Sequence, residues 1–470
     1  MNTKATQRST KKNRKMKIRD LNIGVLLLCL HLISCTTKEN KPTENISKPI
    51  EVVAPINEAG RIYERITKSN SSYSVYFPKN YNEKEKYPAI IFIDPHGHGR
   101  FPLEKYKSLA DKFHFLLIGS NDSKNGMNIE QCIKFVGDLL NEASTTLPGY
   151  KEQISIAGFS GGAKVALVAA NTISGFSSGI YCGAAFPPGT IQINIPLLAI
   201  AGRHDMNYTE VRNYNQSIDK SGISHALVEW NGKHEWPDTS IFEHAFYWNL
   251  FTSMRNKTIE KNESIIDRYK KLMESAISQE KNVLNKAILL QEEIEMLNGI
   301  VSISDYQRKL NTIINSNQFK QAKNNQEKIL ANEDQKKMEF AGAFEKQDEL
   351  WWNNEVQSLK ADSNNESNQR VLGYISLAAW SYSSKSVAVN NYPFALKALK
   401  IYKLADPENS EQPFLAACLY SKNGMQDSAI YFLKEAVKLG LDERSKIENE
   451  KDLFELKSRN DFQELVKNLK

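Results

Sequence analysis

The hydrophobic pattern divides the chain into two parts near residue 255. Before that point, short apolar runs alternate with segments in which apolar residues recur every three or four positions. Short apolar runs indicate strands covered on both faces, and the longer spacing indicates amphipathic helices. We predict strands at 73–78, 87–93, 115–119, 179–184, 195–202 and 226–230, a further strand from 154, and helices at 103–113, 128–143, 208–220 and 241–254.

This alternation predicts an α/β fold with a doubly wound, mostly parallel sheet that carries helices on both faces. The segment 73–78 ends at a proline, which favours an edge strand. Ligands of such sheets bind beyond the carboxyl ends of the strands. Polar residues that directly follow the strands are therefore the candidates for chemistry.

After residue 255 the strand runs disappear, glycine becomes scarce, and Lys, Glu, Asn and Gln become frequent. Spaced apolar residues predict long amphipathic helices over 257–350, as either a coiled hairpin or a solvated spacer. The polar segment 320–346 predicts one exposed helix. Trp351 and Trp352 begin a more apolar segment, in which we expect them to anchor a helix in a core.

The last part of the chain, 351–470, contains a weak repeat. Ala395 and Ala429 lie 34 positions apart, as do Tyr402 and Ala436. This spacing of small and large residues resembles the tetratricopeptide repeat, with one good unit and one degenerate unit. The resemblance implies an all-α domain that binds a protein partner or acts as a rigid stalk, with a capping helix over 453–469.

The first 34 residues resemble a bacterial lipoprotein signal. A basic run precedes an apolar segment at 21–33, which is too short to span a bilayer and ends in Leu-Ile-Ser before Cys35. The resemblance implies cleavage before Cys35, its modification with lipid such as palmitate, and a membrane-anchored protein facing the periplasm or the exterior, with the outer membrane favoured. The alternative is an ordinary signal peptide in which Cys35 has no role.

The predicted organisation is a signal at 1–34, a tether at 35–59, a sheet domain at 60–256, helices at 257–350 and a repeat-like domain at 351–470. The net charge of +6 is spread along the chain and indicates no nucleic-acid partner. Three cysteines are far apart in apolar surroundings, so we expect them to be buried thiols and not a disulfide framework or metal site: Cys132, Cys182 and Cys418. Nothing in the sequence requires a cofactor.

The candidate chemistry starts at Gly158-Phe159-Ser160-Gly161-Gly162, between a predicted strand and a predicted helix. The G-x-S-x-G pattern in this context is a nucleophile elbow, which exposes the serine at the start of the helix. The dipole of that helix and the backbone N–H of Gly161 can stabilise an oxyanion at this position.

Two further residues follow later strands in the order that a nucleophile elbow requires. Asp205 lies just beyond the strand at 195–202, and His234 just beyond the last strand. We therefore predict a triad in which Ser160 is the nucleophile, His234 transfers its proton, and Asp205 orients the imidazole.

The turn His96-Gly97-His98-Gly99 follows the strand at 87–93. A glycine-rich turn there can direct a backbone N–H toward the oxyanion. The alternative is a metal pair made by His96 and His98, with Asp94 as a third ligand. We predict no metal site, because no further cluster with ligand spacing follows.

Residues 60–256 resemble an α/β-hydrolase of the compact esterase branch that includes polyhydroxyalkanoate-depolymerase-like and feruloyl-esterase-like enzymes. The matching segments are 92–99, 158–163, 202–205 and 232–237. The resemblance implies ester hydrolysis through an acyl-enzyme, with His98 and Gly161 as the oxyanion donors. Since little chain is left for a lid, we expect an open site for a bulky, polymeric or surface-presented ester.

Two alternatives stay open. One is a serine peptidase of the same fold, and the other is a catalytically idle fold that serves as a scaffold for binding through the repeat-like helices. We expect specificity to lie in the loops after Gly99, at 121–126 and at 186–188.

Overall fold

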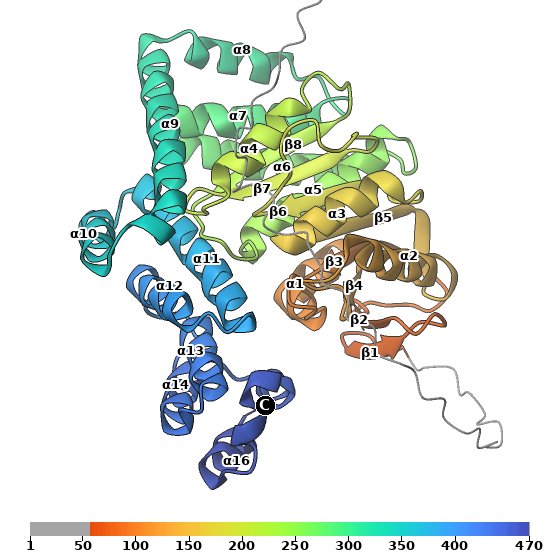
Figure 1. The fold of residues 1–470 in the computed structure, drawn as a ribbon. Helices are drawn as coiled ribbons and strands as arrows, with labels where there is room; N and C mark the ends of the chain where they lie inside the picture. The colour runs from red at the N-terminus through yellow and green to blue at the C-terminus, as the bar shows by residue number, and fades with distance from the viewer. Residues whose placement is uncertain (1–56, 470) are drawn as a thin grey trace, which may run out of the picture. The chain divides into compact units, whose positions relative to one another are not determined.

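The computed structural model of the chain describes residues 57–469, and their centre is one eight-stranded sheet (Figure 1). The strand order is β1-β2-β4-β3-β5-β6-β7-β8, with β3 to β8 parallel and β2 antiparallel to both of its neighbours. The strands are β1 (Ile62–Ile66), β2 (Ser72–Tyr76), β3 (Tyr87–Ile93), β4 (Leu116–Ser120), β5 (Gly149–Phe159), β6 (Ser178–Cys182), β7 (Leu197–Gly202) and β8 (His225–Trp230).

The prediction of an edge strand at 73–78 is wrong. That segment is β2, which pairs with β1 on one side and β4 on the other. Pro78 lies beyond the last paired residue, so it ends the strand without removing a hydrogen bond from the sheet. The edge strand is β1, whose short sequence Ile-Tyr-Glu-Arg-Ile lacks a long apolar run and escaped prediction.

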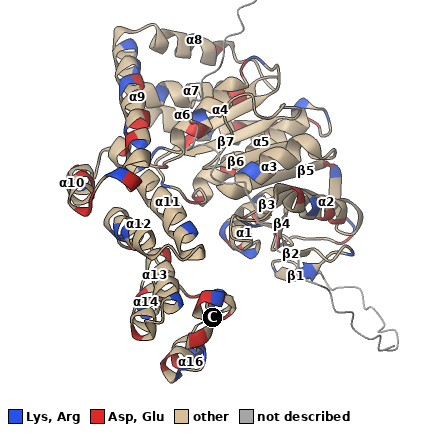
Figure 2. Ribbon diagram, in the orientation of Figure 1, with Lys and Arg blue, Asp and Glu red and all other residues tan. Residues whose placement is uncertain are grey.

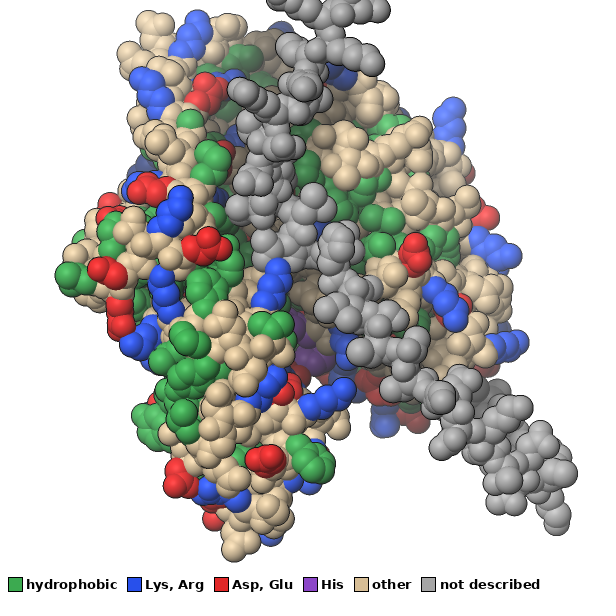
Figure 3. All heavy atoms as spheres, viewed as in Figure 1, with side chains coloured by type: hydrophobic (Ala, Val, Ile, Leu, Met, Phe, Trp, Pro, Cys, Tyr) green, Lys and Arg blue, Asp and Glu red, His purple; other side chains and the backbone are tan. Residues whose placement is uncertain are grey.

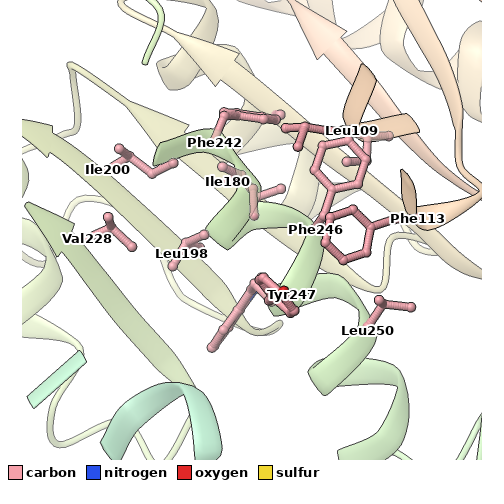
Figure 4. Packing of buried hydrophobic residues seen from close by; sticks show 14 of the residues in the cluster. Leu109, Phe113, Ile180, Leu198, Ile200, Val228, Phe242, Phe246, Tyr247 and Leu250 are labelled. Atoms are coloured by element: carbon pink, nitrogen blue, oxygen red, sulfur yellow. The ribbon is translucent and has the colours of Figure 1, made fainter. Parts of the chain in front are cut away.

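Helices cover both faces of the sheet, as predicted. They are α1 (Arg100–Phe113), α2 (Ile129–Thr145), α3 (Gly161–Thr172), α4 (Tyr208–Ser217) and α5 (Thr239–Arg255). Successive strand residues point to opposite faces, so Ile90 and Phe92 pack with α1 and α5, while Ile91 packs with α2 and α3. Figure 4 shows Phe242 and Phe246 of α5 packed with apolar residues of α1 and the strands. The predicted fold class is confirmed: a mostly parallel sheet with helices on both faces is followed by a helical region.

Residues 257–350 contain α6 (Glu263–Gln279), α7 (Val283–Leu297), α8 (Ser304–Ile314) and α9 (Asn317–Lys346). Ile266, Tyr269 and Leu297 are buried in the same apolar cluster as α5 and the sheet. Glu295 also accepts a hydrogen bond from the backbone N–H of Leu227 in β8. Helices α6 and α7 are therefore part of the sheet's core, and neither is a solvated spacer.

Helix α9 corresponds to the polar helix expected at 320–346. Acidic and basic residues lie along it (Figure 2), but it is not exposed throughout. Phe340 and Phe344 are buried, and so is the carboxylate of Glu333. The expected helix is therefore present and largely exposed, and its buried part is Glu333 and its C-terminal end.

The remaining elements are α10 (Glu349–Lys360), α11 (Glu366–Ala388), α12 (Tyr392–Ala405), α13 (Glu411–Lys422), α14 (Gln426–Lys438), α15 (Arg444–Asn449), the 3₁₀ helix η1 (Lys451–Leu456) and α16 (Asn460–Lys467). Helices α11 and α12 pack together, as do α13 and α14. Trp352 is fully buried in a core, as expected. The single capping helix predicted at 453–469 is wrong, because η1 and α16 divide that segment. Assignment of these pairs to tetratricopeptide repeats stays a prediction.

The predicted signal, Cys35 and most of the tether lie outside the described residues. Within 57–469, no helix is both long and apolar enough to cross a membrane. Cys132, Cys182 and Cys418 are buried free thiols, as predicted. All described residues belong to one compact unit, within which the helical region contacts the sheet domain.

Candidate active site

Ser160 occupies a strained turn between β5 and α3. Its φ of 52° and ψ of −122° are unfavourable for a residue with a side chain, and such strain costs about 1–3 kcal/mol. The turn requires two glycines at backbone contacts. A Cβ on Gly158 would lie 2.1 Å from the Gly162 carbonyl oxygen, and a Cβ on Gly162 would lie 2.0 Å from that of Ile93.

His234 joins Ser160 to Asp205. Its Nε2 lies 2.9 Å from Ser160 Oγ, and its Nδ1 lies 2.9 Å from each carboxylate oxygen of Asp205. This geometry fits a ring whose Nδ1–H donates to Asp205 and whose Nε2 accepts from the serine hydroxyl. Asp205 is only 2% exposed, so its charge is shielded from water and directed at the imidazole. The structure thus brings together the three residues of the predicted triad.

A glycine that the sequence analysis missed makes room for Asp205. Gly183 follows β6 with a φ of +66°, and a Cβ there would lie 2.9 Å from Asp205 Oδ2 and 2.7 Å from the Phe159 ring. Its carbonyl accepts a 2.8 Å hydrogen bond from the Asn207 side chain, and the backbone N–H of Asn207 donates to Asp205 Oδ1. The sequence prediction extends the strand over 179–184 and so includes this glycine, and its position near the carboxyl end of that strand was the only signal that could have identified it.

Asp94 organises the turn at 96–99. Its Oδ1 accepts from the backbone N–H of His96 at 2.9 Å and of His98 at 3.4 Å, and its Oδ2 accepts from the Trp236 indole at 2.8 Å. Burial alone would raise the pKa of Asp94, but hydrogen bonds from His96 and Trp236 lower it below its ordinary value. The hydrogen bond with Asp94 raises the pKa of His96. Asp94 therefore ties this turn to the segment that carries His234, a role the sequence analysis did not assign.

The two predicted oxyanion donors lie in different surroundings. Gly161 is the first residue of α3, where backbone N–H groups have no partner within the helix. The His98 N–H instead lies against Asp94. Asn125, in the loop expected to govern specificity, reaches Gly161: a Cβ on this glycine would lie 1.8 Å from the Asn125 side-chain oxygen.

The metal alternative has no support in the part of the chain that the structure describes, which contains no group of three potential ligands. The rings of His96 and His98 lie 5.9 Å apart. His98 Nε2 lies 3.4 Å from a carboxylate oxygen of Glu443, just before α15. Figure 3 shows histidine side chains in a hollow of the face it draws.

Among known proteins, only solved structures show a similarity to this chain. No family model and no curated protein matches the chain. Similar solved structures include a fluorophosphonate-binding serine hydrolase of Staphylococcus aureus, with 11% identity over 40% of this chain and 97% of that chain and a TM-score of 0.34. An esterase of Pyrobaculum calidifontis has 13% identity over 42% and 85%, with a TM-score of 0.34. A feruloyl esterase module of Clostridium thermocellum, complexed with sinapinate, has 12% identity over 41% and 87%, with a TM-score of 0.33.

Proposed function

We propose that this protein is a serine hydrolase that cleaves a carboxylic ester through an acyl-enzyme. The continuous hydrogen-bonded path from Ser160 through His234 to buried Asp205 is the observation that supports it. Ser160 Oγ attacks the ester carbonyl while His234 takes its proton, and His234 then protonates the leaving alcohol. Water, deprotonated by the same imidazole, releases the acid and restores the serine.

The Gly161 N–H is the better supported oxyanion donor, because the start of α3 leaves it outside the helix hydrogen bonds. Donation by His98 requires its N–H to turn away from Asp94 when substrate binds. The Asn125 carboxamide touches Gly161, so substrates that reach Gly161 also meet this side chain.

A fluorophosphonate probe tests the activated serine. Wild-type protein should be labelled, and Ser160→Ala and His234→Ala should not be. Ser144→Ala is the matched control, since Ser144 is a half-buried serine outside the site that bonds to the Asn141 carbonyl within α2. Absence of labelling in folded wild-type protein would reject the hydrolase and favour the idle scaffold.

Substrate panels then separate the two chemistries that the site could perform. Turnover of acyl esters without turnover of matched amides supports the esterase. Amide turnover with the same dependence on Ser160 supports the peptidase. The substrate class that we propose is an ester-bearing small molecule or polymer.

We also propose that Cys35 carries the lipid anchor, from the resemblance of residues 1–35 to a lipoprotein signal. Cells fed an alkyne analogue of palmitate should label wild-type protein and Cys29→Ser but not Cys35→Ser. Equal labelling of both variants would reject an anchor at this position.

A further inference from the structure

The loop that carries Asp205 is held from outside the sheet. Arg370 Nη1 in α11 donates to the carbonyl oxygen of Arg203 at 2.5 Å. Lys337 Nζ in α9 donates to the carbonyl oxygen of Met206 at 2.8 Å. These two carbonyls lie on either side of Asp205 in the sequence. The helical region therefore holds the loop by hydrogen bonds both before and after this residue.

One carboxylate, that of Glu333, pairs with both of these cationic side chains. Glu333 lies 2.7 Å from Lys337 Nζ and 2.8 Å from Arg370 Nη2. Glu333 and Arg370 are 1% and 2% exposed. Burying such charges carries a desolvation penalty that their attraction only partly offsets. We therefore assign them a geometric role, since they fix two backbone carbonyls at set positions.

Three further contacts join α11 to the residues around Asp205. The guanidinium of Arg370 lies 5.0 Å from the ring of Tyr208, the first residue of α4. Gly373 of α11 faces the Met206 side chain, since a Cβ there would lie 3.4 Å from it, an ordinary contact distance. The side chain of Gln369 contacts the ring of His204. Helix α11 thus meets residues on both sides of Asp205.

We propose that Lys337, Arg370 and Glu333 are positioning residues for Asp205, so that the helical region completes the catalytic site. This inference rests on the proposed function. Asp205 must reach His234 Nδ1 with both oxygens at 2.9 Å, and the carbonyls of Arg203 and Met206 beside it are bonded to side chains of the helical region. Misplacing a catalytic group by 1 Å can cost about 100-fold in rate.

The test is Lys337→Met in the full chain, which removes the ammonium, keeps most of the length of the side chain and leaves Glu333 paired with Arg370. Lys360→Met is the matched control, because Lys360 also donates to a backbone carbonyl, that of Leu404, within the helical region. We expect Lys337→Met to lower kcat for an activated ester by about tenfold at unchanged KM, and Lys360→Met to leave both constants unchanged.

A second measurement does not depend on turnover. The proton shared by His234 and Asp205 should give a downfield proton NMR signal, assigned by its loss in Asp205→Asn. This signal should weaken or shift in Lys337→Met and persist in Lys360→Met. Arg370→Lys should retain part of the signal and of kcat, whereas Arg370→Met should retain less.

The outcomes separate the two proposals. A wild-type chain that hydrolyses esters, with Lys337→Met equal to it in kcat and in the downfield signal, overturns the positioning role and leaves the hydrolase standing. Equal losses of kcat in Lys337→Met and Lys360→Met also overturn it, since they indicate general destabilisation. A wild-type chain that neither labels nor hydrolyses overturns the proposed function, and the positioning role for catalysis with it.

Discussion

The two loops that meet at His234 are held in different ways. The Ser160 turn is fixed by backbone contacts, since Gly158 lies against the Gly162 carbonyl and Gly162 lies against the Ile93 carbonyl of the neighbouring strand β3. The Asp205 loop has backbone hydrogen bonds to Trp230 and Gly232, and side chains of α9 and α11, more than a hundred residues along the chain, also bond to its carbonyls. The first half of the site is therefore fixed within the sheet domain, and the second half also contacts the helical region.

This difference shows why a short motif can identify a nucleophile but not the complete site. A strained turn at Ser160 survives only where glycines remove the clashes, so the sequence has to display them. The contacts of the Asp205 loop with Lys337 and Arg370 use backbone carbonyls, which any residue can supply. These contacts are visible only when the helices have been placed on the loop.

The largest effect is expected from Asp205→Asn, which removes the carboxylate from the loop that the helical region contacts. The amide would donate toward His234 Nδ1 and favour the wrong tautomer, so kcat should fall by a factor on the order of 10⁴. This fall in kcat is measured as the rate at which the variant hydrolyses an activated ester.

Asp219→Asn is the control for this substitution. Asp219 also lies 3.0 Å from a histidine nitrogen, that of His225, but outside the site. We expect its rates to match the wild type. A small effect of Asp205→Asn would mean that the position of the carboxylate matters little, and the contrast between the two loops would lose its functional meaning.

Much of the sheet and of the site could be predicted from the sequence. Buried parallel strands appear as apolar runs, and the order of Ser160, Asp205 and His234 follows from the strand ends on which they lie. Polar strand β1 has no such run, so its existence depends on pairing with β2.

The rest of the site consists of contacts between distant positions. Gly183 appears in the sequence as one residue of a predicted strand until Asp205 is placed beside it. Arg370 appears as one polar residue of an amphipathic helix, because burial against Glu333 and the Arg203 carbonyl depends on how α11 packs. No local pattern encodes either contact.

Gly162→Ala disturbs the half of the site that glycines fix within the sheet domain. Its Cβ would lie 2.0 Å from the carbonyl oxygen of Ile93, and neither backbone can move without displacing Ser160. We expect the free energy of unfolding to fall by about 3 kcal/mol, with loss of fluorophosphonate labelling. Urea unfolding measures the first effect.

Gly342→Ala is the matched control, because a Cβ on this helical glycine of α9 meets nothing within 4 Å. Its free energy of unfolding should rise by about 0.5–1 kcal/mol through helix propensity. If Gly162→Ala behaved like Gly342→Ala, the turn would not be fixed by its backbone.

The smallest effect is expected at the turn 96–99. The neighbouring Asp94 holds this turn and also bonds to the distant Trp236. The hydrogen bond with Asp94 raises the pKa of His96, so the folded protein binds this proton more tightly than the unfolded chain does. The stabilisation by His96 is then fully present below its ordinary pKa of 6.5 and disappears as the pH rises through the raised value. The difference in Tm between wild type and His96→Asn should be small, largest in acid and absent in alkali, because the ring is mostly exposed. In an Asp94→Asn background this pH dependence should vanish, and its persistence there would show that another group is the partner of His96.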